Sequence, residues 1–360
     1  MRAVVLTGHG GLDKLVSTDE LATPTPQAGE VLVRVGACGL NNTEVNTRTG
    51  WYDSVVESSV SEELGVHGRD DGAASSWNQA SVHFPRIQGA AVVGRIAAVG
   101  HGADRARIGE RVLVDPSVRD EDLPPRAQLV EYLGSERDGG FAEYVAVPSI
   151  NAHVVDSPLS DAELATFPCS YDTAEEMLER AGLSKGETIA ITGAAGGVGT
   201  ALIQLALARG AHVIAIAGAA KESRLRELGA HDFVPRDSGV LREEVEELVG
   251  ERGVDVVADV VGGAMFDTVL KMLRRGGRYT TAGAIGGPTT KIDLRDLIYK
   301  DLEMYGITNP TALTFTRLVE IVQTGLVTPL LEEAFPLSEL RTAQERLLKR
   351  THVGKYVIVP

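Results

Sequence analysis

The segment Thr188–Gly199, with the sequence TIAITGAAGGVG, constrains the fold of this 360-residue chain more than any other. Its first residues, Thr188–Thr192, form a short apolar run that predicts a buried strand, and Thr200–Arg209 has the apolar spacing of a helix. A strand, a glycine-rich turn and a helix in this order form the fingerprint of a dinucleotide-binding βαβ unit. An ordinary tight turn between a strand and a helix is the alternative interpretation.

Two glycines of this turn have different predicted roles. Gly196 lets the backbone approach a pyrophosphate, and Gly199 lets the helix pack closely on the strand. Ala194 replaces the first glycine of the usual G-x-G-x-x-G pattern. The helix N-terminus offers unpaired N–H groups and partial positive charge to the phosphates. The predicted cofactor contacts in the turn are Ala195, Gly196, Gly197 and Val198.

The next predicted strand, His212–Ala217, indicates which dinucleotide is bound. A site for NAD usually has Asp or Glu at the end of this strand, where the acid holds the ribose 2′-hydroxyl. Here Gly218, two alanines and Lys221 follow, and Arg236 comes after another short strand over Asp232–Pro235. Small residues and cations suit a 2′-phosphate, so we predict NADP(H), although each cation alone is also typical of a solvated surface.

The size and charge of the chain exclude several classes of protein. A chain of 360 residues exceeds one typical core and predicts two domains. A net charge of −15 argues against binding to nucleic acids or anionic membranes. There is no membrane-spanning run and no signal-peptide pattern, and two distant cysteines make no disulfide framework. We therefore expect a cytoplasmic protein that acts on a small molecule.

The chain changes character near residue 156. The β-rich part is predicted over 1–155 and 310–360, and an α/β doubly wound domain with a parallel sheet over 156–309. Strands of the β-rich part are predicted over Arg2–Thr7, Glu30–Ala37, Ala90–Val99, Arg111–Asp115, Phe141–Pro148 and Lys355–Val359. Further strands are predicted over Val254–Val260, Gly277–Ala282 and Met304–Thr308, and helices over 162–166, 173–181, 311–324 and 337–350.

Four segments together resemble the medium-chain dehydrogenase/reductase superfamily over essentially the whole chain. They are ACGLNNTEVNTRTGWY (Ala37–Tyr52), FPRIQGAAVVGRIAAVG (Phe84–Gly100), IGERVLV (Ile108–Val114) and the glycine turn. The resemblance implies a GroES-like catalytic domain, a Rossmann domain and oxidoreductase activity. It also implies a homodimer that pairs through the strand around Met304–Thr308, since an exposed edge strand favours such pairing.

The same resemblance separates zinc-dependent from zinc-free members. In the zinc branch, metal ligands would fall at Asn41, Ala90 or Ala91, and Cys169, so only the cysteine survives here. A catalytic zinc normally has three protein ligands, and the four clustered cysteines of the family's structural zinc site are also absent. We therefore predict no metal. Cys169 is expected to be a small packing residue near the nicotinamide, with an activated nucleophile as the alternative.

The segment Asp53–Arg86 is polar and has little periodicity, so it predicts a long loop. Such a loop is either a lid over the substrate pocket or a surface insertion. His67 and His83 within it are candidates to complete a metal site, although solvated loop histidines are commoner.

The zinc-free quinone oxidoreductase branch often carries an Asn and a Tyr beside the nicotinamide, at the places of Asn41 and Tyr52. The resemblance implies that Tyr52 donates a proton to the substrate carbonyl or polarises it, and that Asn41 donates a hydrogen bond to the same oxygen. Aromatic packing of Tyr52 and a turn satisfied by Asn41 are the alternatives.

Further cofactor contacts are predicted outside the turn. Thr173 matches a threonine at the start of the family's helix behind the nicotinamide, or it is the N-cap of that helix. Lys355 matches a Gly-Lys near the adenosine phosphate, or it is a surface lysine. Gly283 and Ala284, after the strand Gly277–Ala282, complete the predicted contacts.

These observations predict an NADPH-dependent, zinc-independent oxidoreductase that transfers hydride to a quinone or an α,β-unsaturated carbonyl. Oxidation of a simple alcohol is harder without a Lewis acid to lower the pKa of its hydroxyl. A zinc-free alcohol dehydrogenase or carbonyl reductase is one alternative, and an NADPH-binding sensor without turnover is another. Gln88 differs from the Asp of many quinone reductases near this point, which bears on the substrate more than on the fold.

Overall fold

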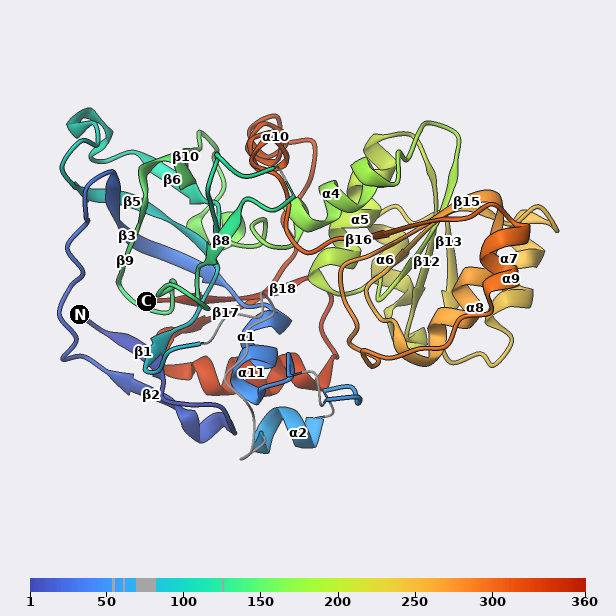
Figure 1. Cartoon of the computed structure of the whole chain (residues 1–360), viewed down its shortest axis with the longest axis horizontal. Coiled ribbons are helices and arrows are strands. Elements are labelled where there is room, and N and C mark those ends of the chain that lie inside the picture. Colours follow the sequence, from blue (N-terminus) through green and yellow to red (C-terminus); the bar gives the residue numbers. More distant parts are fainter. Residues whose placement is uncertain (54–55, 61, 69–81, 125) are drawn as a thin grey trace. The chain divides into compact units, whose positions relative to one another are not determined.

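The computed structural model describes residues 1–53, 56–60, 62–68, 82–124 and 126–360 (Figure 1). The chain forms two compact units. Unit 1 comprises Met1–Val56, Val60–Cys169 and Thr311–Pro360, and unit 2 comprises Glu57–Ser59 and Ser170–Pro310. Residues 156–169, which we assigned to the doubly wound domain, belong to unit 1.

Unit 1 is built around a mainly antiparallel sheet. Its strands follow the order β10-β6-β5-β3-β18-β17, and β9 also pairs with β3. They are β3 (Glu30–Gly39), β5 (Ala91–Val99), β6 (Arg111–Val114), β9 (Tyr144–Pro148), β10 (Ala152–Val154), β17 (Leu331–Pro336) and β18 (Lys355–Val359). Val31, Val33 and Val35 alternate along β3 and are buried in the core, as expected for a strand. The strand nearest the end of the sequence, β18, therefore lies directly beside β3.

Smaller elements surround this sheet. A three-stranded sheet contains β1 (Ala3–Leu6), β2 (Leu15–Thr18) and β4 (Arg86–Ile87), and β7 (Ser117–Arg119) pairs with β8 (Leu129–Tyr132). The helices are α1 (Asn42–Thr49), α2 (Glu62–His67), α3 (Asp161–Leu164), α10 (Ala312–Gln323) and α11 (Leu340–Lys349). Helix α2 lies in the segment that we predicted to be a loop, so that prediction was wrong over 62–67. The predicted lid falls largely on 54–55, 61 and 69–81, which lie outside the described residues.

Arg48 of α1 holds α1, α2 and α11 together through hydrogen bonds of its guanidinium. Its side chain is fully buried, and its guanidinium donates to the carbonyl of Gly10 at 2.9 Å, the carbonyl of Gly65 in α2 at 2.5 Å and Gln344 Oε1 in α11 at 2.8 Å. Burial lowers the pKa of Arg48 to about 10, and Asp13 opposes this shift. One buried cation thus fixes three separate segments, and Figure 1 shows α1, α2 and α11 gathered together.

Unit 2 contains a six-stranded parallel sheet in the order β13-β12-β11-β14-β15-β16. The strands are β11 (Thr188–Thr192), β12 (His212–Ala217), β13 (Asp232–Pro235), β14 (Val254–Asp259), β15 (Leu273–Thr281) and β16 (Glu303–Gly306). The buried runs of β11, β12 and β14 are typical of strands covered on both faces. This order is that of the doubly wound dinucleotide-binding fold, so the predicted fold class is confirmed. The strand order reverses direction between β11 and β14, where such folds bind their ligands.

The helices of unit 2 connect these parallel strands. They are α4 (Tyr171–Arg180), α5 (Gly197–Ala208), α6 (Glu222–Glu227), α7 (Leu241–Val249), α8 (Phe266–Lys271) and α9 (Leu294–Tyr299). Helix α4 has Ser170 as its N-cap, so the alternative that Thr173 caps this helix was wrong. The earlier start places Tyr171 against α5, where Gln204 Nε2 donates to its hydroxyl at 2.7 Å. In the described ranges, no helix is both long enough and apolar enough to cross a membrane.

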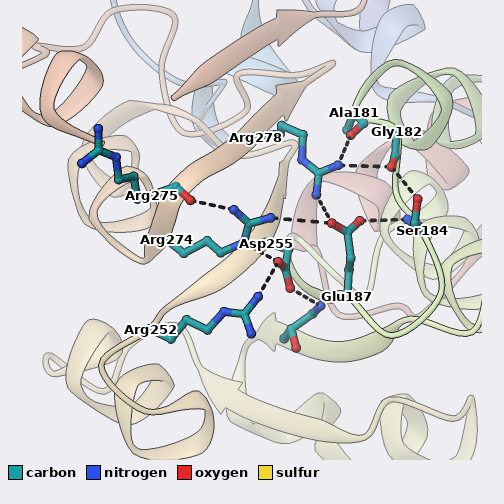
Figure 2. A network of polar contacts seen from close by, with 10 residues as sticks. Ala181, Gly182, Ser184, Glu187, Arg252, Asp255, Arg274, Arg275 and Arg278 are labelled. Carbon is teal, nitrogen blue, oxygen red and sulfur yellow. Dashed lines mark hydrogen bonds and ion pairs between the residues drawn. The ribbon is translucent and has the colours of Figure 1, made fainter. Parts of the chain in front are cut away.

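A network of ion pairs joins the amino ends of three parallel strands (Figure 2). Glu187, just before β11, lies 2.5 Å from Arg278 and 3.8 Å from Arg274, both of β15. Arg274 also pairs with Asp255 of β14, which accepts a 2.8 Å hydrogen bond from the Thr188 N–H. Burial raises the pKa of Asp255, but this hydrogen bond and Arg274 outweigh it and lower the pKa overall. The network lies at the amino ends of the strands, whereas the glycine turn follows the carboxyl end of β11. This distance from the turn indicates a structural role.

Candidate functional site

The glycine turn follows β11 at the carboxyl edge of the parallel sheet. Gly193 has a φ of 57°, in the left-handed region, and a Cβ at this residue would lie 2.7 Å from Val260 Cγ2. Both constraints favour glycine here. Gly196 is the N-cap and α5 begins at Gly197, so the first N–H groups of α5 face the turn.

Gly196 and Gly199 differ in the space around them. A Cβ at Gly196 would meet only the Gly193 carbonyl oxygen, at 3.5 Å, whereas a Cβ at Gly199 would lie 2.3 Å from that oxygen. Gly199 therefore lets α5 pack against the turn, and Gly196 leaves open space beside its backbone. Gly196, Gly197 and Val198 are partly exposed, and Ala195 is buried. This open cradle at a helix N-terminus fits the pyrophosphate of a dinucleotide.

Asp259, which our sequence reasoning missed, organises this edge of the sheet. Its fully buried carboxylate accepts hydrogen bonds from the hydroxyls of Thr192 and Tyr279 and from the N–H groups of Val261 and Gly262, the latter two at 2.8 and 3.1 Å. The pKa of Tyr279 is raised, first by burial and then by Asp259. The carboxylate thus links the ends of β11, β14 and β15. The sequence signal that could have identified Asp259 is an acidic residue at the end of an apolar predicted strand.

The residues predicted to bind a 2′-phosphate lie at the ends of β12 and β13. The N–H of Arg236 donates to the Ala217 carbonyl at 2.9 Å, which brings these two strand ends together. The Arg236 guanidinium is exposed and pairs with Asp237 at 3.2 Å, and Lys221 is half-buried. Gly218 follows β12 directly, without an acid beside it.

Gly283 and Ala284 lie in the loop after β15, beside the loop after β14. A Cβ at Gly283 would be 2.9 Å from the Val260 carbonyl oxygen, and a Cβ at Gly262 would be 3.4 Å from Ala284 Cα. These predicted contacts therefore share the carboxyl edge of the sheet with the glycine turn. Thr173 lies in the first turn of α4.

In unit 1, Asn41 stands between β3 and α1, at the N-cap of the helix. Its N–H donates to the Glu44 carboxylate at 2.7 Å, and the Ala90 N–H donates to the same carboxylate at 3.2 Å. Burial raises the pKa of Glu44, and the Lys355 ammonium and the N–H donors partly offset that shift. The backbone of Asn41 thus caps α1, where the alternative interpretation expected a turn, and its carboxamide makes a further contact.

That contact is with Lys355, the first residue of β18. The Lys355 Nζ lies 2.5 Å from Asn41 Oδ1 and 3.4 Å from the carbonyl oxygen of Pro168. The residue is only 4% exposed, so the alternative that Lys355 is a surface lysine was wrong. Its contact with an adenosine phosphate stays a prediction.

Tyr52 follows α1 and is half-buried. Its ring meets that of Trp51 edge to face with centroids 5.5 Å apart, and Asn46 Nδ2 lies 3.5 Å from its hydroxyl oxygen. Burial raises the pKa of Tyr52 well above the usual range. The hydroxyl therefore stays protonated near neutral pH and is available as a hydrogen-bond donor. The contact with Trp51 also agrees with a packing role.

The residues at the expected zinc position do not fit a catalytic zinc. Ala90 and Ala91 carry no ligand atom, and Asn41 is bound by the Lys355 ammonium. The Cys169 Sγ lies 3.2 Å from the Tyr132 hydroxyl oxygen. Three protein ligands are usual for such a metal.

The two loop histidines do not supply the missing ligands. His67 and His83 are both exposed. Within the part of the chain that the structure describes, no three His, Cys, Asp or Glu side chains are grouped to hold a metal. The hypothesis that these histidines complete a metal site therefore has no support in the described residues.

Comparisons with known proteins agree with both units. Residues 27–158 match the family model of the alcohol dehydrogenase GroES-like domain, and residues 197–324 match that of the zinc-binding dehydrogenases. The human quinone oxidoreductase is 25% identical over 100% of this chain and 98% of its own. A Sinorhizobium meliloti structure, provisionally described as an alcohol dehydrogenase, is 50% identical with a TM-score of 0.91, covering 100% of this chain and 96% of its own. A mycobacterial protein solved with NADPH is 25% identical with a TM-score of 0.78, and each chain is covered completely.

The two units and these matches define the class of protein: the chain belongs to the medium-chain dehydrogenase/reductase superfamily. Within that superfamily it is an oxidoreductase, similar along its whole length to quinone oxidoreductases.

Proposed function

We propose that this protein is an NADPH-dependent, zinc-independent reductase of quinones or α,β-unsaturated carbonyls. The observation that carries the proposal is the residue set at the expected zinc position, where two alanines, an amide bound by an ammonium and a single thiol cannot hold a catalytic metal. The human quinone oxidoreductase, similar over the whole chain, supports the substrate class.

The cofactor preference rests on unit 2. The open backbone at Gly196 accommodates the pyrophosphate, and Gly218, Lys221 and Arg236 offer space and positive charge for the 2′-phosphate. Ala195, Gly197 and Val198 complete the contacts of the turn, and Thr173, Gly283 and Ala284 are the other proposed contacts. When bound, NADPH supplies the hydride that reaches the substrate carbon.

The substrate carbonyl is polarised by unit 1. As hydride reaches the β-carbon of an enone, negative charge gathers on the carbonyl oxygen, and hydrogen-bond donors aimed there lower the barrier. Asn41 supplies an amide N–H and Tyr52 a hydroxyl that burial keeps protonated. The proton that completes the reduction comes from Tyr52 or from water.

We also propose a homodimer in which two copies pair along β16. This strand is at the edge of the sheet of unit 2 and pairs only with β15 among the described strands. Met304 on β16 is 40% exposed. An exposed edge of this kind favours pairing with a second copy.

To test this function, the metal content of the purified protein is measured first. Oxidation of NADPH and of NADH is then followed with a quinone, an enone or a saturated aldehyde as the acceptor. We expect turnover of the quinone or the enone with NADPH, undiminished by a chelator. Turnover of the aldehyde alone would favour a carbonyl reductase or alcohol dehydrogenase, the activity suggested by the 50% identical relative. Binding of NADPH without turnover of any acceptor would indicate a sensor.

Replacing Tyr52 by Phe tests its proposed role. The ring contact with Trp51 is kept and the donor is removed, so we expect kcat to fall by about a hundredfold while the Kd for NADPH is unchanged. Tyr299→Phe is the matched control, because this tyrosine is 71% exposed on α9 and lies outside the proposed site. Full activity of Tyr52→Phe would remove the hydroxyl from the mechanism and leave packing as its role.

A further inference from the structure

The ammonium of Lys355 lies near two positions at which the zinc branch of the superfamily has metal ligands. Asn41 and Cys169 stand at those ligand positions. The Nζ lies 2.5 Å from Asn41 Oδ1 and 3.4 Å from the carbonyl oxygen of Pro168, the residue before Cys169. A cation that belongs to the chain itself therefore lies where a zinc-dependent relative would hold a metal ion.

The pairing of β18 with β3 produces this arrangement. The two strands are antiparallel, with Val357 opposite Gly39, and the same register continued along the chain brings Lys355 opposite Asn41. Gly39 makes room for the lysine stem, because a Cβ there would lie 3.2 Å from Lys355 Cε and 2.3 Å from the Ala165 carbonyl oxygen. The position of the ammonium is thus fixed by the sheet and not by a loop.

The burial of this cation needs an explanation, because taking an ammonium out of water is costly. Arg48, the other buried cation described above, joins three segments of unit 1 and so has a structural role. Lys355 instead contacts the carboxamide of a proposed catalytic residue. The buried Glu44 carboxylate is close enough for Lys355 to favour its charged form. The negative charge of Glu44 offsets part of this cost, and the contact of the ammonium with Asn41 indicates a role at the proposed site.

The ammonium also determines how Asn41 is presented. A carboxamide has one accepting end and one donating end. Because Oδ1 accepts from Lys355, the donating end is Nδ2. Among the described residues, its contacts are long, at 3.3 Å to the Gly39 carbonyl and 3.5 Å to Glu44 Oε1. The N–H groups of Nδ2 are therefore suited to bind a substrate carbonyl oxygen.

We propose that Lys355 is a positioning residue: its ammonium binds Asn41 Oδ1 and so holds the carboxamide with Nδ2 available as a hydrogen-bond donor to the substrate oxygen. This inference rests on the proposed reductase function. No additional reactant is needed, because this role of Lys355 involves no proton transfer, and the hydride and proton follow the routes given above.

The test combines Lys355→Met, Asn41→Ala and the double variant. Lys355→Met keeps the length of the side chain and removes the charge, so we expect kcat for the quinone or enone to fall by about a hundredfold, with the Kd for NADPH within about twofold. Because the lysine acts through Asn41, the double variant should lose no more than the worse single variant. Lys349→Met, at an exposed position on α11, is the matched control and should behave as the wild type.

Multiplied losses in the double variant would show that the two residues act independently and would overturn the proposal. Weakened NADPH binding with unchanged kcat would also overturn it, and would assign Lys355 to the adenosine phosphate. If Lys355→Met does not fold, Lys355→Arg keeps the charge and should retain about a tenth of kcat or more. A loss as large as that of Asn41→Ala would contradict the proposal.

One readout does not depend on turnover. The side-chain amide signal of Asn41 in an NMR spectrum, assigned by its absence in Asn41→Ala, should shift and exchange faster in Lys355→Met but not in Lys349→Met. An unchanged signal would overturn the positioning role. If the wild type reduces no acceptor, the proposed function fails, and this signal still tests whether Lys355 orients Asn41.

Discussion

Replacing Arg48 by Met is expected to lower the free energy of unfolding by about 4 kcal/mol. The substitution keeps much of the apolar stem and removes the guanidinium, which leaves the carbonyls of Gly10 and Gly65 and the side-chain oxygen of Gln344 buried without their charged donor. Urea denaturation, followed by tryptophan fluorescence, measures this loss. Trp51 lies in unit 1, just after α1.

The control for this prediction is the same substitution at the surface. Arg242 pairs with Glu246 one turn along α7, and its side chain is 46% exposed, so Arg242→Met should cost less than about 0.5 kcal/mol. Equal stability of the two variants would mean that the three acceptors find other partners when the guanidinium is removed. In that case Arg48 would not be what joins α1, α2 and α11.

The second large effect separates two glycines that look equivalent in the motif. Gly199→Ala places a Cβ 2.3 Å from the Gly193 carbonyl oxygen, so the turn or α5 must shift, and we expect a loss of about 2 kcal/mol or more in stability. Gly196→Ala meets nothing closer than 3.5 Å, and its φ of −76° suits alanine. It should therefore cost less than about 1 kcal/mol.

The same Gly196→Ala variant should bind NADPH about tenfold more weakly or worse, a loss of ~1.4 kcal/mol, because the added methyl occupies space that the pyrophosphate needs. Thermal unfolding and titration with NADPH measure the two quantities separately. Wild-type affinity in Gly196→Ala would show that the pyrophosphate does not pass this residue. Gly199→Ala is the control with the opposite expectation, because it should lower the free energy of unfolding more than the affinity for NADPH.

The sequence was sufficient for elements whose signal is local. The bounds of β11, β12 and β18 match the predicted strands, because each is a buried apolar run that ends at a turn or a polar residue. The start of α5 was predicted at Thr200 and lies at Gly197, because glycines that read as turn residues also form the first helical turn. Helix α2 was missed, since its short polar sequence has no clear apolar periodicity and its place depends on contacts with α1 and α11.

The candidate site was predictable only in part. The motif located the glycine turn, and the family resemblance drew attention to Asn41, Tyr52 and Lys355. The contact between Lys355 and Asn41 was not predicted, because it joins residues far apart in the chain and depends on the register of β18 against β3. Asp259 was missed for a similar reason, since its donors come from three different strand ends.

The place of β18 in the sheet has a consequence for the order in which the protein assembles during synthesis. Unit 2 ends at Pro310, whereas β18 lies between β3 and β17 in the sheet of unit 1. A ribosome therefore releases every residue of unit 2 before the sheet of unit 1 can close. In the nascent first unit, β9 already pairs with β3 over 30–34, but Cys38 and Gly39 lack their partners in β18. The arrival of β18 completes this pairing and brings the Lys355 ammonium to Asn41.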